Sequence, residues 1–274
     1  MPKLLQLSRR KFIHGASCAC GTSLLLSSCA EVPMSERKQL NIVSDDFLYS
    51  KTFPAYENFK SQSKLITGTK EYNEIVDIGF NIRDAINAYY QVNHKENPTT
   101  NFQWEFILVD DDQTKNAWCM PGGKIAFYTG ILPIAKNKDG IASIMGHEVA
   151  HAVARHSAER ASTAILADVG TMALEQLILG QRLPKAAGYI RQFGLNLPFN
   201  RSQESEADYL GLIFSSLAGY NVNESYKVWE RMVEDSGGSG PSEFFSTHPS
   251  PKNRIKKLKE WIPLVNVQYP AIST

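Results

Sequence analysis

The segment His147-Glu148-Val149-Ala150-His151 constrains what this chain can fold into more than any other part of its sequence. Residues four apart on an α-helix share a face, so His147 and His151 can reach one cation, with Glu148 directly beside it. The segment therefore requires a helix with a buried side, and we expect one over residues 141–163, opened by Asp139-Gly140. Zinc suits two imidazole ligands, and Glu148 can then act as the general base for an attacking water.

A third protein ligand has to come from elsewhere, and the acidic run Glu204-Ser205-Glu206-Ala207-Asp208 offers carboxylates on another predicted helix. A common extension of the motif places a third histidine six residues after the second, where this chain has Ser157, so that class of site is excluded. Glu204 and Asp208 share a helix face, so if Glu204 binds zinc, Asp208 can hold a ligand histidine through its second nitrogen. Glu206 points roughly to the other side, and we interpret it as a solvated surface charge.

The pattern of the remaining residues predicts one mostly helical domain with a small sheet. The chain has 274 residues, of which 43% are hydrophobic, and can bury one substantial core. Helical periodicity and short runs of aromatic and branched residues mark the elements. We predict helices over residues 70–92, 141–163, 164–179, 202–217, 224–235 and 252–261, and strands over 102–109, 117–120 and 124–129. The fold class is α+β and predominantly α-helical, with the domain covering residues 66–274.

Charge and hydropathy exclude several classes of protein. Lysine and arginine number 29 against 28 acidic residues, a net charge of +1, which argues against a nucleic-acid-binding surface. After the first thirty residues, no stretch is long and apolar enough for a membrane span. Polytopic membrane proteins, collagens, coiled coils and disulfide-built miniproteins are therefore excluded.

The first 65 residues follow a different pattern. Basic residues precede a weakly polar to apolar run that ends in small residues before Cys29, which is typical of a secretory signal and resembles a bacterial lipobox. We interpret residues 1–28 as a lipoprotein signal peptide, Cys29 as the lipid-modified residue, and 29–65 as the lipidated N-terminus and a polar tether that packs against the body. Residues 8–13 resemble a twin-arginine signal. An uncleaved N-terminal anchor helix is the alternative.

Four blocks of sequence occur in a fixed order: Asn116-Ala117-Trp118-Cys119-Met120-Pro121-Gly122-Gly123-Lys124-Ile125, the histidine motif continued to His156, Asn200-Arg201-Ser202-Gln203-Glu204-Ser205-Glu206-Ala207-Asp208, and Thr247-His248-Pro249-Ser250-Pro251-Lys252-Asn253-Arg254-Ile255. Together they resemble the zinc metallopeptidases of the HtpX, Oma and CAAX-prenyl-protease superfamily, especially periplasmic lipoproteins of the LoiP and BepA type. The resemblance implies a zincin domain of the gluzincin type. It implies zinc ligands His147, His151 and Glu204, with Glu148 as general base and Asp208 behind the ligands.

The resemblance also implies how substrates bind and what they are. The first block resembles the family's cleft-edge strand, with which an extended substrate can pair by β-augmentation. The residues of that edge are Asn116, Ala117, Pro121, Gly122 and Gly123. Substrates would be unfolded or misassembled cell-envelope proteins. The chain would be anchored through Cys29 and face the periplasm, at the outer membrane rather than the inner, with the outer-membrane assembly machinery as a further partner.

Two residues of the last block have open roles. His248 can occupy the water position and keep the enzyme latent, it can stabilise the transition state, or it can be a loop histidine with no role. Arg254 can bind a carbonyl or carboxylate, or lie at the surface. The alternative function is a chaperone or assembly factor for outer-membrane proteins with a latent zinc site, although Glu148 disfavours it because a structural site needs no base.

Overall fold

The structure is a computed structural model that describes residues 29–35, 37–166, 199–235, 244, 248 and 251–272. Its helices are α2 (Asp45–Gln62), α3 (Lys70–Val92), α4 (Leu132–Ala135), α5 (Lys138–Val153), α8 (Arg201–Leu217), α9 (Glu224–Asp235) and α11 (Pro251–Gln268), with a 3₁₀ turn at Thr129–Ile131 and a further helical stretch over 156–166. Its strands are β1 (Cys29–Glu31), β2 (Lys38–Leu40), β3 (Leu65–Ile66), β4 (Glu105–Val109), β5 (Ala117–Met120) and β6 (Lys124–Tyr128). Within these ranges, no helix combines the length and apolarity that crossing a bilayer requires. The predicted α+β, predominantly helical class is confirmed.

Strands β3 to β6 form one four-stranded sheet in the order β3-β4-β6-β5. β6 runs parallel to β4, whereas β3 and β5 are antiparallel to their neighbours. In this order β5 lies at an edge of the sheet. The turn from β5 to β6 passes through Gly122 and Gly123, with φ angles of 92° and 81° that favour glycine. The predicted strands at 117–120 and 124–129 are thus confirmed.

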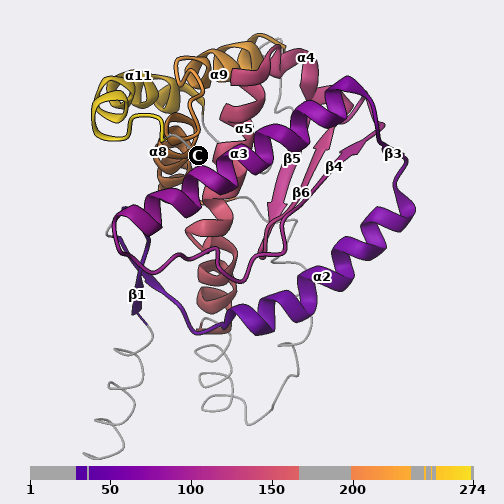
Figure 1. The fold of residues 1–274 in the computed structure, drawn as a ribbon. Coiled ribbons are helices and arrows are strands. Elements are labelled where there is room, and N and C mark those ends of the chain that lie inside the picture. The colour runs from indigo at the N-terminus through magenta and orange to yellow at the C-terminus, as the bar shows by residue number, and fades with distance from the viewer. Residues whose placement is uncertain are drawn as a thin grey trace, which may run out of the picture.

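Helix α5 lies at the centre of the fold. The sheet lies on one side of it and helices α8, α9 and α11 on the other, while α3 crosses it (Figure 1). Its closest partner is α8, and a pair of glycines explains the close approach. A Cβ added at Gly211 would lie 2.8 Å from the backbone nitrogen of His147, and one at Gly146 would lie 2.8 Å from the carbonyl oxygen of Gly211. The two backbones therefore meet beside the histidine motif, which brings the start of α8 within reach of it.

The segment between Cys29 and the body is more regular than the sequence indicated. Strands β1 and β2 form an antiparallel hairpin, and α2 is an 18-residue helix where we expected an irregular tether. Ser44 caps α2 by accepting a hydrogen bond from Phe47 N. The helix was missed because its buried stripe is narrow, consisting of Leu48, Thr52 and Tyr56, and because Pro54 lies inside it. The domain limits remain a prediction.

The predicted helix over 141–163 is wrong in one respect that matters for the site. α5 begins earlier, at Lys138, and ends at Val153, after which Arg155 takes a left-handed φ of 56° before the next helical stretch begins. Arg155 is held in place by Asp45, whose Oδ1 accepts from its Nε at 2.9 Å, and by the carbonyl oxygen of Val43 at 3.2 Å. The regular helix is therefore interrupted directly after the histidine motif.

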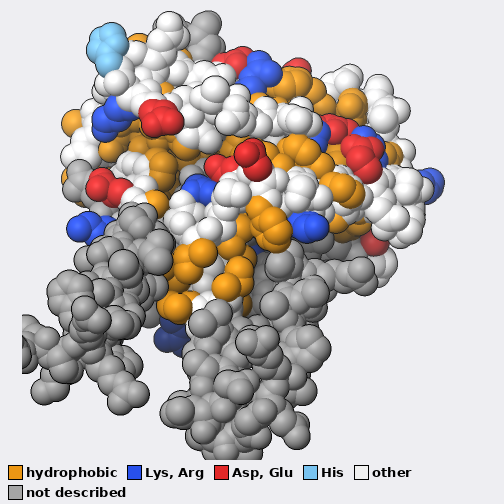
Figure 2. All heavy atoms as spheres, turned by 90° about the horizontal axis from the view of Figure 1, so that it is seen from below, with side chains coloured by type: hydrophobic (Ala, Val, Ile, Leu, Met, Phe, Trp, Pro, Cys, Tyr) orange, Lys and Arg blue, Asp and Glu red, His pale blue; other side chains and the backbone are white. Residues whose placement is uncertain are grey.

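Three further expectations meet the structure in different ways. The helices at 70–92, 202–217 and 224–235 are confirmed within a residue, and the last helix is longer than predicted because Pro263 does not end it. The predicted helix over 164–179 lies mostly outside the described residues, as does the predicted signal peptide. Acidic and basic side chains are interspersed on the face seen from below (Figure 2).

Candidate metal centre

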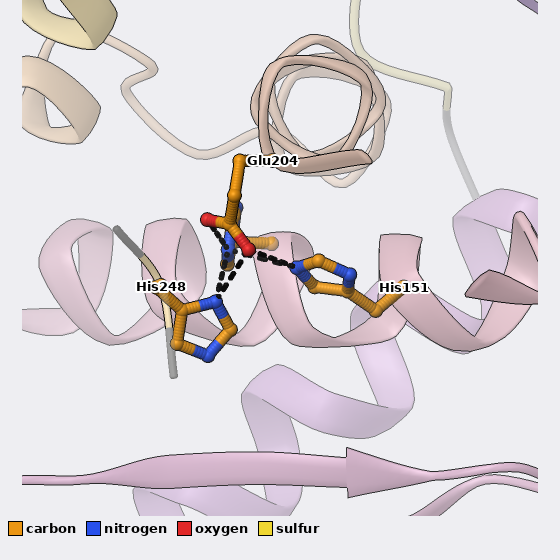
Figure 3. A group of neighbouring side chains, drawn as sticks. His151, Glu204 and His248 are labelled. Atoms are coloured by element: carbon orange, nitrogen blue, oxygen red, sulfur yellow. Dashed lines mark hydrogen bonds and ion pairs between the residues drawn. The ribbon is translucent and has the colours of Figure 1, made fainter. Parts of the chain in front are cut away.

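Four side chains with metal-ligating atoms converge in the interior. His147 and His151 project from α5, Glu204 comes from the first turn of α8, and His248 lies between α9 and α11. All four are buried, and one ligand atom from each lies within 4.8 Å of the others. Figure 3 shows the carboxylate of Glu204 between the rings of His151 and His248. The three predicted ligands, His147, His151 and Glu204, thus lie together, and His248 joins them as a fourth side chain.

The spacing of these atoms fits a tetrahedral zinc ion. His147 Nε2 lies 3.2 Å from His151 Nε2 and 3.6 Å from Glu204 Oε2, and His151 Nε2 lies 3.5 Å from Glu204 Oε1. Two ligand atoms bound at about 2.1 Å to one tetrahedral ion lie about 3.4 Å apart. His248 Nδ1 lies 3.4 Å from His147 Nε2 and 2.9 Å from Glu204 Oε1, so it stands where a fourth ligand would. The donor set of imidazoles and one carboxylate is one that zinc prefers.

Glu148 lies beside these donors and is not one of them. The residue is 2% exposed, the backbone N–H of Cys119 donates to its carboxylate, and its Oε1 has no hydrogen-bond partner among the described residues. His248 Nε2 is 3.5 Å from that oxygen. Burial raises the pKa of Glu148 to about 7. A carboxylate with a free oxygen and this affinity for protons can accept one from a neighbouring water.

A carboxylate and an arginine stand behind His147. Asp208 Oδ1 lies 3.2 Å from His147 Nδ1, as the helix spacing predicted. Arg254 donates to Asp208 Oδ2 at 2.6 Å, and its Nη1 lies 2.6 Å from Glu204 Oε2. Burial raises the pKa of Asp208, but the charge of Arg254 and the hydrogen bonds with Arg254 and His147 together outweigh burial and hold that pKa at about 2. Arg254 itself is 5% exposed, so its proposed surface position is wrong, and its partners are the carboxylates of Asp208 and Glu204. Its role in the reaction stays a prediction.

Behind His151 the structure differs from the sequence-based interpretation. Glu206 was interpreted as a solvated surface charge, yet it is only 8% exposed and its Oε2 lies 2.8 Å from His156 Nε2. His156 Nδ1 lies 2.8 Å from His151 Nδ1. On a straight helix, residues five apart lie on different faces. The helix is interrupted at Arg155, and the ring of His156 contacts that of His151.

Aromatic rings enclose the histidines, although no sequence motif predicts their positions. Phe199 stacks on His151 with ring centroids 3.7 Å apart, Phe244 stacks on His248 at 4.4 Å, and Trp229 meets His147 edge-on at 5.9 Å. These rings come from segments far apart in the chain, so no local sequence motif indicates that they meet the histidines. They remove the cluster from water, which strengthens every electrostatic interaction inside it.

The predicted substrate-binding edge is beside the cluster. β5 packs on α5, and the Cys119 N–H bond to Glu148 joins the two elements. Asn116 and Ala117 lie at the start of β5, and Pro121, Gly122 and Gly123 form the turn at its end. Over the described ranges, β5 pairs with β6 alone. The other edge of β5 is paired with none of the described strands, which is the arrangement that β-augmentation uses. Its use by substrate stays a prediction.

Comparison with known proteins gives a family. The model of peptidase family M48 matches residues 82–262. The mitochondrial metalloendopeptidase OMA1 of Schizosaccharomyces pombe is 35% identical over 95% of this chain and 74% of its own length. The human OMA1 metalloendopeptidase is 32% identical over 57% of this chain, and the β-barrel assembly-enhancing protease of Escherichia coli is 27% identical over 60%. The chain spans 32% and 35% of the lengths of these two relatives. By its sequence match and by the metal-ligating cluster on α5 and α8, this chain belongs to peptidase family M48, a family of metallopeptidases.

Proposed function

We propose that this chain is a zinc-dependent endopeptidase that hydrolyses peptide bonds at the α5–α8 cluster. The observation that carries the proposal is the arrangement of His147, His151 and Glu204 at the spacing of a tetrahedral site, with Glu148 beside them and outside the donor set. This arrangement separates ligands from a base, which is what metal-assisted hydrolysis needs.

The roles of the residues follow from their positions. Zinc bound at this site would supply Lewis acidity, polarising the scissile carbonyl and lowering the pKa of water. Glu148 takes the proton from the attacking water and passes it to the leaving amine. The free edge of β5 holds the substrate extended beside Glu148, because Cys119 on that strand contacts Glu148 directly.

The proposed location is the cell envelope, with the chain lipid-anchored at Cys29 and facing the periplasm, at the outer membrane. The support is the basic, then apolar start of the sequence and the small residues before Cys29. Incorporation of a palmitate analogue that is lost in the Cys29→Ser variant tests the anchor, and equal labelling of both proteins would contradict it.

The proposed substrates are unfolded or misassembled envelope proteins. A relative named a β-barrel assembly-enhancing protease supports a role near outer-membrane assembly, while the OMA1 relatives are named as mitochondrial enzymes. An open strand edge accepts main-chain hydrogen bonds from any extended segment, which suits a protease that acts on unfolded chains.

Metal analysis and cleavage of casein test the activity. We expect one zinc per chain and casein cleavage that a chelator abolishes and added zinc restores, because zinc held by these donors would activate the attacking water. Absence of bound metal after zinc is supplied would contradict the proposal. Zinc without cleavage, in every variant tested, would favour the chaperone or assembly factor instead.

A further inference from the structure

The ring of His151 is held by a chain of side chains that reaches the N-terminal hairpin. We propose that His156 and Glu206, together with Arg37 from the hairpin, are positioning residues that fix His151 for metal binding. The inference deepens the proposed function and rests on it, since it takes His151 Nε2 as a zinc ligand. His156 and Glu206 lie outside the ligand set, and both would otherwise be buried polar groups without a purpose.

The contacts form a continuous line. His151 points Nε2 into the donor cluster and Nδ1 away from it, where His156 Nδ1 lies 2.8 Å away. On the far side of His156, Nε2 lies 2.8 Å from Glu206 Oε2. His156 is fully buried, so no water competes for either of its nitrogens. A ligand histidine commonly passes its second nitrogen to a carboxylate, and here a second imidazole is inserted between them.

Only one arrangement of protons satisfies this line when His151 binds metal. Nε2 must offer its lone pair to the metal, so the ring proton of His151 lies on Nδ1. His151 Nδ1–H then donates to His156 Nδ1, which places the proton of His156 on Nε2, and that N–H donates to Glu206. The carboxylate at the end of the line therefore selects the tautomer of His151 that can bind the metal, through the ring of His156.

Glu206 is itself held by the hairpin. Arg37, between β1 and β2, donates from Nε to Glu206 Oε2 at 2.9 Å, and the Ser35 hydroxyl donates to Glu206 Oε1. The same guanidinium forms two bonds with Glu159, at 2.6 and 2.9 Å, and Glu159 also accepts from Gln203 at 2.8 Å. Arg37 is thus fixed from both sides.

The two ligand histidines are supported in parallel ways. His147 is backed by Asp208 and Arg254, with the arginine on α11, and His151 by Glu206 and Arg37, with the arginine in the hairpin. Docking of the hairpin that follows Cys29 is therefore coupled to the geometry of the metal site.

Zinc affinity of the full-length chain, measured by competition with a chromophoric chelator, tests the inference. We expect Glu206→Gln and His156→Ala to bind zinc about 10- to 100-fold more weakly, the range found for lost partners of ligand histidines. Arg37→Ala should weaken binding by less, and Arg37→Lys, which retains the charge beside Glu206, should recover most of the loss. In ¹H–¹⁵N spectra of the metal-free protein, His151 should carry its proton on Nδ1, and Glu206→Gln should populate the other tautomer.

Glu224→Gln is the matched control, because Glu224 is equally buried, is bonded to Arg231, and lies on α9 away from the ligands. Wild-type affinity in Glu206→Gln and His156→Ala would overturn the inference, as would an equal loss in Glu224→Gln. If Glu206→Gln does not fold, the two Arg37 variants decide, since that side chain is partly exposed. A wild-type chain that binds no zinc would contradict the proposed function instead, and the tautomer of His151 would still test the positioning roles.

Discussion

Replacing Glu148 with glutamine is expected to lower the rate of casein cleavage about 1,000-fold while leaving one zinc bound per chain. A general base contributes about 10²- to 10⁴-fold to the rate, and a carboxamide of the same shape accepts no proton. Zinc should stay because Glu148 is not among the four donors. Initial cleavage rates and metal content, measured on the same preparation, check both halves of the expectation.

The control for this variant is Glu105→Gln, which removes a carboxylate from β4 where it pairs with Lys60 and Lys124. It should cleave casein at nearly the wild-type rate. If Glu148→Gln keeps more than about a tenth of the activity, Glu148 is not the general base and another group must take the proton. Loss of zinc together with activity would show that Glu148 holds the site together.

Replacing His248 with alanine is expected to raise casein cleavage about tenfold or more. His248 Nδ1 stands at the fourth corner of the donor set, 2.9 Å from Glu204 Oε1, where a water has to enter for hydrolysis. If only a minor population has this ring displaced, about 10% or less, removing the ring makes the open site permanent. Zinc should be retained by His147, His151 and Glu204.

The sign of the change separates the hypotheses about His248. A histidine that stabilises the transition state would give a loss of about 10²- to 10³-fold on replacement by alanine, and one with no role would give no change. His94→Asn provides the comparison, since His94 is an exposed histidine after α3 whose left-handed φ of 51° asparagine tolerates. Its cleavage rate should match the wild type.

Features set by local periodicity could be predicted from the sequence. The i, i+4 spacing places His147 and His151 on one face, and the same rule places Glu204 with Asp208, because both α5 and α8 are regular helices at these positions. The turn at Gly122-Gly123 follows from the conformations that only glycine adopts easily. The same turn separates the two predicted strands, which correspond to β5 and β6.

Features set by contacts between distant segments could not be predicted. The burial of Glu206 depends on Arg37 and Ser35, which are far away in the chain, so its own neighbours give no sign of it. The position of His156 depends on the break at Arg155, which is stabilised by Asp45 at the start of α2. A single residue with positive φ changes the direction of every side chain after it, and helical arithmetic cannot anticipate that.

The bonds around the metal-ligating cluster also determine when it can form during synthesis. Arg37 bonds to Glu206 across 169 positions, and Arg254 reaches His147 across 107. Contacts of such long range close late in folding, because the loop entropy must be overcome before they are made. Before residue 254 has left the ribosome, the histidines of α5 are already made. At that stage Asp208 and Glu204 still lack the arginine that pairs with them in the finished fold. The pairing of Asp208 and Glu204 with Arg254 is therefore completed only after the last helix, α11, has been made and has docked.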